Sequence, residues 1–170
     1  HITNEIKNKV YEAGISSGAD IVITEIGGTV GDIESQSFIE ALRQIQYEKG
    51  SEDTFFIHCT LIPFIYGSNE LKTKPTQNSV RDLRNMGIRA DALVKNKLSL
   101  FCSVPVENVI DSIDVKNIYE IPINYYNQKI DEIILKQFKL PIKKANLTKW
   151  KNLITTVENL KDEIEISLVG

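Results

Sequence analysis

Two short polar segments carry residue types that could bind a polyphosphate together with a divalent metal. The first, 25–35, reads Glu-Ile-Gly-Gly-Thr-Val-Gly-Asp-Ile-Glu-Ser and places three carboxylates around a glycine-rich turn. The second, 72–77, reads Lys-Thr-Lys-Pro-Thr-Gln and combines two lysines with two hydroxyls and an amide. Because carboxylates suit Mg²⁺ and lysines suit phosphate oxygens, the two segments together predict a site for a polyphosphate and a divalent metal.

The carboxylate turn, residues 25–35, follows an apolar run at 20–25 that predicts a buried strand. Ligands of open α/β sheets collect at the carboxyl ends of strands, so Glu25 is placed to hold Mg²⁺ directly or through water. Asp32 and Glu34 come just before a helix start, where they could bind a ribose or a base, or could simply be first-turn caps. A Gly-Gly-x-x-Gly string by itself leaves both interpretations open.

The lysine segment, residues 72–77, predicts a phosphate-binding loop. In an extended backbone, Lys72 and Lys74 would point to the same side, so both ammonium groups could reach one triphosphate. Pro75 stiffens the loop, and Thr76 and Gln77 precede a helix whose free N–H groups favour anions. An ordinary solvated lysine-rich loop is the alternative interpretation.

The elements that position these segments follow from apolar spacing along the chain. Helices are predicted near 3–13, 35–50, 78–87, 125–138 and 149–160. Strands are predicted at 20–25, 54–62, 91–94, 109–110 and 118–121, with a final strand from 166. Strands that alternate with helices predict an α/β fold, with a parallel sheet flanked by helices.

Composition fits one globular domain with a core, since 42% of the 170 residues are hydrophobic and 25% are charged. The net charge of −3, with both signs interspersed, argues against nucleic acid as a partner. No apolar run reaches the roughly 20 residues of a membrane span, and no signal peptide is recognisable. Cys59 and Cys102 are expected to be core thiols of a cytoplasmic protein, His58 a hydrogen-bonded strand histidine, and Trp150 a packing residue.

Five strings of the chain resemble the synthetase, or amidoligase, domain of the CTP synthases. They are His-Ile-Thr-Asn-Glu-Ile at 1–6, the whole carboxylate turn at 25–35, Phe-Ile-Glu-Ala-Leu-Arg-Gln at 38–44, Glu-Leu-Lys-Thr-Lys-Pro-Thr-Gln at 70–77 and Lys-Leu-Ser-Leu-Phe-Cys at 97–102. The similarity extends from His1 to about Trp150. It implies a phosphate-loop NTPase-like fold of the dethiobiotin-synthetase type, with the amidoligase domain at 1–160 and the start of a linker at 161–170.

The resemblance also implies a reaction. The family transfers phosphate from ATP to the 4-oxygen of UTP, and ammonia from a glutaminase domain then displaces that phosphate to give CTP. The implied protein is therefore a glutamine-hydrolysing ligase of pyrimidine biosynthesis, with Mg²⁺ as cofactor and ATP as co-substrate. CTP is expected as feedback inhibitor, GTP as activator and a homotetramer as the assembly.

Individual roles carry over by resemblance only. Glu25 is implied as the Mg²⁺ ligand, and no catalytic residue is assigned beyond Lys72 as a candidate. Both UTP and CTP are expected to be bound by Lys72, Thr73, Lys74, Pro75, Thr76, Gln77 and Lys97. CTP is also expected to contact Asp32, Ile33 and Glu34, and the adenine of ATP is expected at Ile113, Asp114 and Val115.

The chain departs from the family pattern in three places. The family has a phosphate-binding glycine–lysine loop and a second metal-binding aspartate upstream of its equivalent of His1, and a glutaminase domain downstream of Gly170. We therefore expect an internal piece of a longer protein, which alone makes no CTP. Only Lys95 and Asn96 separate Val94 from the following helix, where the family has a longer loop. We interpret this as mobile residues missing from the chain as given, rather than as a true deletion.

Two other functions stay open at this point. A non-catalytic sensor or assembly subunit that binds CTP would also explain the motifs, because those for CTP are complete and those for the ATP phosphates are not. Another phosphate-loop ligase or ATPase is a third reading, against which the string at 70–77 argues. The presence or absence of a glycine–lysine loop in the complete reading frame would separate the enzyme from the non-catalytic sensor.

Overall fold

The computed structural model describes residues 1–65, 67, 69–94, 104–161 and 164–167. Its helices are α1 (Ile2–Ser17), α2 (Ile33–Lys49), α3 (Lys74–Asn85), α4 (Ile121–Asn127), α5 (Ile130–Gln137) and α6 (Thr148–Glu158). Its strands are β1 (Ile57–Cys59), β2 (Phe64–Ile65), β3 (Glu70–Leu71), β4 (Ala92–Val94) and β5 (Val109–Ile110). Two 3-10 turns, η1 (Val106–Asn108) and η2 (Ile118–Glu120), complete the described elements.

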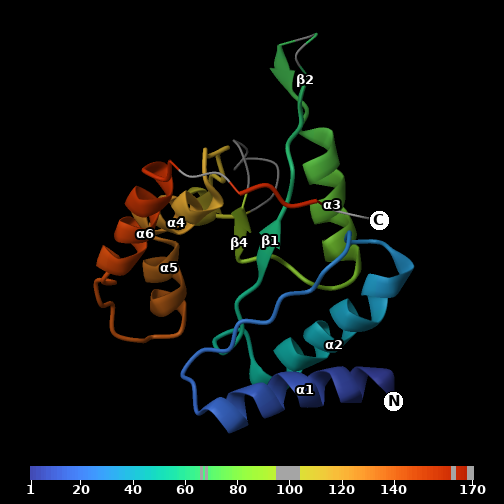
Figure 1. Ribbon diagram of the computed structural model, residues 1–170. Coiled ribbons are helices and arrows are strands. Elements are labelled where there is room, and N and C mark those ends of the chain that lie inside the picture. The colour runs from blue at the N-terminus through green and yellow to red at the C-terminus, as the bar shows by residue number, and fades with distance from the viewer. Residues whose placement is uncertain (66, 68, 95–103, 162–163, 168–170) are drawn as a thin grey trace.

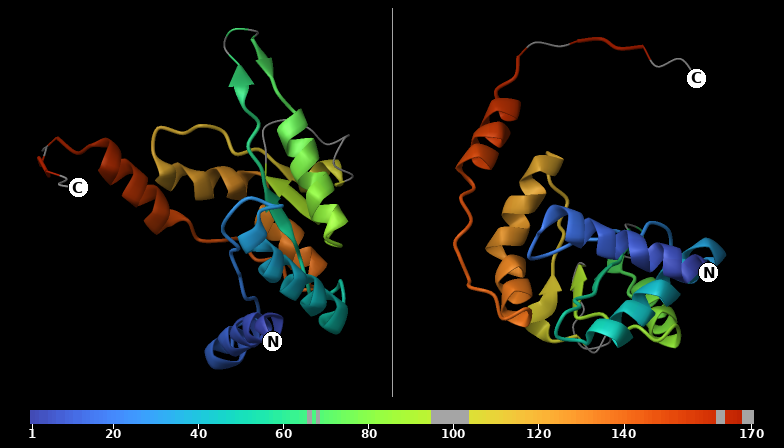
Figure 2. Two further views of the ribbon diagram at one scale, coloured as in Figure 1. Left: turned by 90° about the vertical axis from the view of Figure 1, so that its right-hand side faces the viewer. Right: turned by 90° about the horizontal axis from the view of Figure 1, so that it is seen from below.

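A small parallel sheet occupies the centre of the fold, with helices to either side of it (Figures 1 and 2). Its strand order is β1-β4-β5, so β4 is central, with Ile57 opposite Ala92 and Leu93 opposite Val109. Ala92 and Leu93 are fully buried, and Val80 of α3 packs on Leu93. The predicted α/β class with a parallel sheet and flanking helices is confirmed.

Asp91 braces the sheet at the point where β4 begins. Its carboxylate Oδ2 accepts a hydrogen bond from the Phe56 N–H at 2.8 Å, and its own N–H donates to the Phe56 carbonyl at 2.8 Å. The Asn108 side-chain amide donates to the Asp91 carbonyl at 2.9 Å. Burial raises the pKa of Asp91, and the bond from Phe56 opposes that rise. One residue thus links the chain before β1 to the chain before β5.

Two polar contacts attach α3 to the chain around β1. His58, 7% exposed, lies with Nε2 at 3.0 Å from Ser79 Oγ, which confirms the expected hydrogen-bonded strand histidine. Its Nδ1 is buried without a partner among the described residues. Thr76 Oγ1 donates to the Leu61 carbonyl at 3.2 Å. The start of α3 is therefore positioned by β1 and by the chain just after it.

Polar contacts join α1 to α2. No residue of α1 is buried, so these contacts carry much of its attachment. Glu48 accepts from Lys7 Nζ at 2.5 Å and from the Tyr11 hydroxyl at 2.6 Å. Lys49 Nζ lies 4.9 Å from the centre of the Tyr11 ring. Burial, followed by the bond to Glu48 and its charge, raises the pKa of Tyr11 to about 12.

The predicted strand at 20–25 is wrong, because no residue of this run is in a strand. Ile23 is 91% exposed. An apolar, β-branched run indicates only a local preference, whereas a strand also needs a neighbour for its N–H and C=O groups. Within the described residues, β1 pairs with β4 alone, and nothing pairs with 20–25.

The predicted strand at 118–121 is also wrong, since these residues form η2 and the start of α4. Asn117 and Glu120 form a capping box: the Asn117 side chain accepts from the Tyr119 N–H at 3.0 Å, and Glu120 accepts from the Asn117 N–H at 3.1 Å. Pro122 in the first turn of α4 then favours a helix. Local capping therefore overrides the apolar pattern.

The other predicted elements are present with shifted bounds. The expected helices near 3–13, 35–50 and 149–160 and the strands at 91–94 and 109–110 are confirmed, while the strand at 54–62 shortens to β1. The expected helix 125–138 is two helices, because Lys129 between them has φ +63°. Residues 166–167 are not a strand, and 168–170 lie outside the described residues. No helix in the described parts of the chain is both long and apolar enough to cross a bilayer.

His58 should make the fold less stable as pH falls. Burial lowers the pKa of folded His58 below its ordinary 6.5, so below that pH the unfolded chain binds a proton that the folded chain resists. The contribution is complete above the unfolded pKa and is lost as pH falls towards the folded one. Urea denaturation of the wild type should show a larger loss between about pH 7.5 and pH 5.5 than His58→Gln does. The same loss in both proteins would contradict this assignment.

Candidate functional site

The carboxylate turn lies against the C-terminal part of α3. Val30 packs on the core cluster that contains Leu83 and Ile88, which brings the turn there (Figure 1). Gly28 and Gly31 have φ of +89° and +102°, where a side chain would be strained, so the glycines allow this turn. The turn is thus a defined loop that leads directly into α2.

Glu25 is exposed, and its Oε1 lies 3.8 Å from the position that a Cβ on Gly27 would occupy. Partial burial raises the pKa of the Cys59 thiol, and the negative charge of Glu25 adds to the rise. The Glu25 carboxylate therefore lies close enough to Cys59 of β1 to interact with it electrostatically. Cys59 itself is exposed, and its assignment as a core thiol is wrong because β1 lies at the edge of the described sheet. Cys102 lies outside the described residues.

The donor set around Glu25 fits Mg²⁺ only in combination with a ligand. In the described part of the chain, no group of three or more His, Cys, Asp or Glu residues could hold a metal by itself. Mg²⁺ commonly takes one or two carboxylates plus substrate phosphates and water, so a single exposed carboxylate is compatible with it.

Asp32, Ile33 and Glu34 open α2 and are accessible to a ligand. Asp32 occupies the N-cap position without a side-chain capping bond, and Ile33 is 84% exposed. Glu34 is exposed in the first turn of the helix. The Asp32 carboxylate is therefore not used in a capping bond. Both acids also suit the positive end of a helix.

The lysine segment is not the extended loop that its sequence predicts. Residues 74–77 form the first turn of α3, because Pro75 needs no N–H partner there and its fixed φ suits a helix. Thr76 is 1% exposed, and its bond to the chain near β1 uses its hydroxyl for folding. Gln77 Nε2 donates to Thr73 Oγ1 at 3.2 Å, and the Lys72 N–H donates to the Pro63 carbonyl at 2.9 Å. Lys97 lies outside the described residues.

The two polar segments lie at opposite ends of α3. Lys74 begins the helix, whereas Val30 of the carboxylate turn packs on the core cluster that includes Leu83, nine residues after Lys74. At 1.5 Å per residue this is about 14 Å along the helix axis. Within one chain, the structure thus separates the lysines from Asp32 and Glu34.

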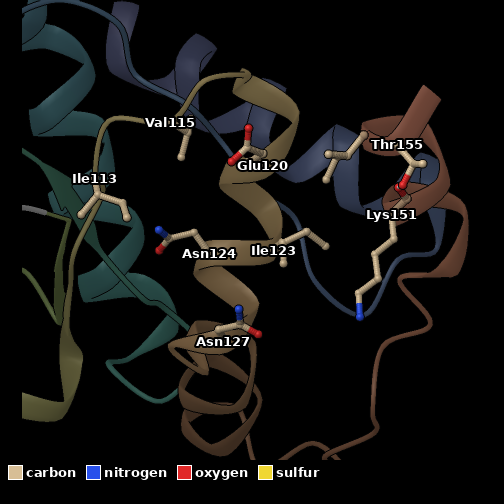
Figure 3. A pocket seen from close by; sticks show the side chains of 9 residues that line it. Ile113, Val115, Glu120, Ile123, Asn124, Asn127, Lys151 and Thr155 are labelled. Carbon is tan, nitrogen blue, oxygen red and sulfur yellow. The ribbon is translucent and has the colours of Figure 1, made fainter. Parts of the chain in front are cut away.

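A cavity of about 410 Å³ lies beside the segment 111–117, α4 and α6 (Figure 3). Two of the three residues expected near adenine, Ile113 and Val115, line it, and Asp114 does not. Its other lining residues are Glu120, Ile123, Asn124, Asn127, Lys151, Ile154 and Thr155. The volume is within the usual range of small-molecule sites.

Gln128 holds the segment that leads into this cavity. Its Oε1 accepts from the Asp111 N–H at 2.7 Å, and its Nε2 donates to the Asp111 carbonyl at 2.7 Å. Tyr125 adds a hydroxyl bond to Ser112 Oγ at 3.2 Å. Sequence reasoning missed Gln128, because no spacing rule indicates that an amide after a helix will pair with a distant backbone.

Comparison with known proteins decides the family. Residues 1–140 match the family model described as CTP synthase N-terminus. The chain belongs to this family. Its alignment with the CTP synthase of Bacillus velezensis shows 48% identity and covers 100% of this chain and 34% of that relative. The CTP synthases of Lactiplantibacillus plantarum and Mesoplasma florum are 50% and 46% identical with the same coverage. The chain thus spans about a third of the length of these curated CTP synthases.

The same alignments bear on the short connection after Val94. They extend over 181 positions, whereas the sequence has 170 residues and continues directly from Val94 to Lys95. Some positions of the CTP synthase relatives therefore have no counterpart in this chain. The alignment has the same length for a true deletion and for residues missing from the chain as given, so the interpretation that mobile residues are missing stays a prediction.

Removing the Gln128 amide should loosen the cavity and lower stability. Gln128→Ala leaves the N–H and carbonyl of Asp111 without their partner, and we expect a loss of about 1–3 kcal/mol in the free energy of unfolding. Gln137→Ala is the matched control, because that exposed amide makes one bond, to the Ser51 carbonyl at 3.0 Å. Its loss should stay below about 0.5 kcal/mol. Equal losses in urea denaturation would show that the paired bonds do not hold the segment.

Proposed function

We propose that the chain is the nucleotide-binding part of an enzyme that aminates UTP to CTP, using ATP and glutamine-derived ammonia. The supporting observation is the family match over residues 1–140, together with the identity to proteins named CTP synthase along the whole chain. Those names do not favour the alternative of a non-catalytic CTP sensor. The proposal includes a phosphate-loop NTPase-like amidoligase domain at 1–160, a linker from 161 and a cytoplasmic ligase.

The proposed chemistry has two steps. The 4-oxygen of UTP attacks the γ-phosphorus of ATP as N3 of the pyrimidine loses its proton, the bond from the γ-phosphorus to the β–γ bridging oxygen breaks, and ADP leaves. Ammonia then adds to C4 of the pyrimidine and loses a proton, and phosphate departs with the former 4-oxygen to leave CTP. Positioning and charge neutralisation supply much of the barrier reduction in phosphoryl transfer, which is the work we assign to this chain.

In the proposal, Glu25 would hold Mg²⁺ together with the nucleotide phosphates, and a bound ion would supply neutralisation of the polyphosphate charge. Lys72 and Lys74, with Lys97, bind the triphosphate of UTP or CTP as point charges. Asp32 to Glu34 contact CTP, and Ile113 to Val115 contact the adenine of ATP. The exposure of Glu25 and Glu34 and the cavity beside Ile113 support these assignments.

We further propose a homotetramer in which one pyrimidine nucleotide contacts two subunits. Closed symmetry would bring the lysine segment of one subunit near the carboxylate turn of another, which agrees with their separation along α3. The β2–β3 hairpin projects from the rest of the fold (Figure 1), and an isolated two-stranded hairpin is only marginally stable in water. A neighbouring subunit would supply the missing contacts. GTP as an activator belongs to the same proposal.

Glu25→Gln tests the proposed metal ligand. The amide keeps the volume of the side chain and loses its charge, so CTP formation by the protein from the complete reading frame should fall about 10- to 100-fold at limiting Mg²⁺. Glu52→Gln, at an exposed turn, is the control and should leave the rate unchanged. Unchanged synthesis in Glu25→Gln would return this residue to the ordinary surface acids.

A second test separates substrate from inhibitor recognition. Lys72→Ala should weaken both UTP use and CTP inhibition, by about 1–3 kcal/mol for a lost charged contact. Glu34→Ala should weaken CTP inhibition more than UTP use, because it contacts only the inhibitor. Steady-state rates at varied UTP and CTP measure both effects. Equal losses for the two nucleotides in Glu34→Ala would contradict distinct contacts.

A further inference from the structure

One wall of the cavity lies beyond the part of the chain that matches the family model. The match ends at residue 140, whereas Lys151, Ile154 and Thr155 come from α6. Figure 3 shows Lys151 and Thr155 across from Ile113 and Val115, with α4 between them. No motif in the sequence indicates a ligand contact on this helix.

An aromatic contact holds α6 beside the cavity. The rings of Trp150 and Tyr119 meet edge to face, with centroids 6.1 Å apart and an interplanar angle of 69°. The Trp150 indole N–H also donates to the Tyr119 carbonyl. Trp150 is therefore a packing residue, as its sequence position indicates. Since Ile154 and Thr155 follow one helical turn after Trp150 and Lys151, the contact determines where all of them lie.

The lining residues suit a ligand with an apolar ring and an anionic group. Four of them are aliphatic and can cover the faces of a flat ring: Ile113, Val115, Ile123 and Ile154. Asn124 is already bonded to Gln128, which leaves the Asn127 amide better placed to meet a ring edge. Lys151 is exposed, and no ion pair of it occurs within the described residues. Its ammonium is the one cation among the described lining residues, and Glu120, whose carboxylate accepts from the Asn117 N–H, is the one acid.

We propose that Lys151 is a nucleotide-binding residue whose ammonium contacts a phosphate oxygen of the adenine nucleotide held by this cavity. The inference rests on the proposed function, which places the adenine of ATP at Ile113 to Val115. An ammonium on a flexible stem reaches phosphate as a point charge and needs no fixed geometry. With Lys151 in this role, α6 carries part of the ATP site, and Trp150 positions it.

The test is equilibrium binding of ATP and of adenosine to the protein from the complete reading frame, measured by titration calorimetry. Lys151→Met keeps the aliphatic stem and removes the charge, so it should weaken ATP about tenfold and leave adenosine within about twofold. Lys151→Arg should retain ATP binding. Lys149→Met is the matched control, because Lys149 is exposed on the same helix and does not line the cavity. Thermal unfolding checks that each variant folds.

The outcomes separate this inference from the proposed function. If Lys151→Met weakens ATP no more than Lys149→Met does, or weakens adenosine equally, Lys151 is only part of the wall and the inference is overturned. Val115→Asp places a charge in the cavity and should weaken both ligands if adenine binds there. Unchanged binding in Val115→Asp, or no binding by the wild type at millimolar nucleotide, would remove the adenine site and the inference with it.

Discussion

The pairing of β4 on both of its sides is the constraint on which the rest of the described fold depends. Among the described strands, only β4 has a neighbour at each edge, and its Ala92 and Leu93 are fully buried. Parallel neighbours need long crossover connections, so the chain must leave the sheet after β1 and return at β4. That connection contains the β2–β3 hairpin and α3, and the exit from β5 leads to the cavity. The lysine segment at the start of α3 and the cavity after β5 are therefore both placed by β4.

Side-chain bonds to the backbone extend this short sheet. Each strand of it has only two or three residues, so the ladder alone fixes few positions. The Asp91 carboxylate and backbone N–H pair with Phe56 before β1, and the Gln128 side-chain amide pairs with both backbone groups of Asp111 after β5. Because a buried N–H or C=O is costly to leave unpaired, these side chains hold the segments in place. The segment that enters the cavity is thus held by α4 and not by a further strand.

Local pattern and local chemistry decide how much of this could be predicted. Helices with regular apolar spacing and the strands β4 and β5 follow from the sequence, since the segments they pack or pair with are present in the fold. The run at 20–25 has the composition of a strand, yet no described segment pairs with it, and composition cannot report that. The capping box of Asn117 and the proline of α3 changed two further assignments, because capping and φ preferences act at single residues.

The candidate site divides in the same way. Long strings such as 25–35 and 70–77 point to the family directly, because few folds require those residues in that order. Gln128 and Lys151 could not be found that way, since their roles depend on which distant backbone or cavity they face. Tertiary placement alone makes them candidates.

Product analysis of the protein from the complete reading frame tests the central claim most directly. With UTP, ATP, Mg²⁺ and either glutamine or ammonia, the account predicts CTP, ADP and phosphate in equal amounts, and no CTP when ATP is omitted. A protein that binds CTP under these conditions but forms none from UTP would contradict the account and would support a sensor in its place.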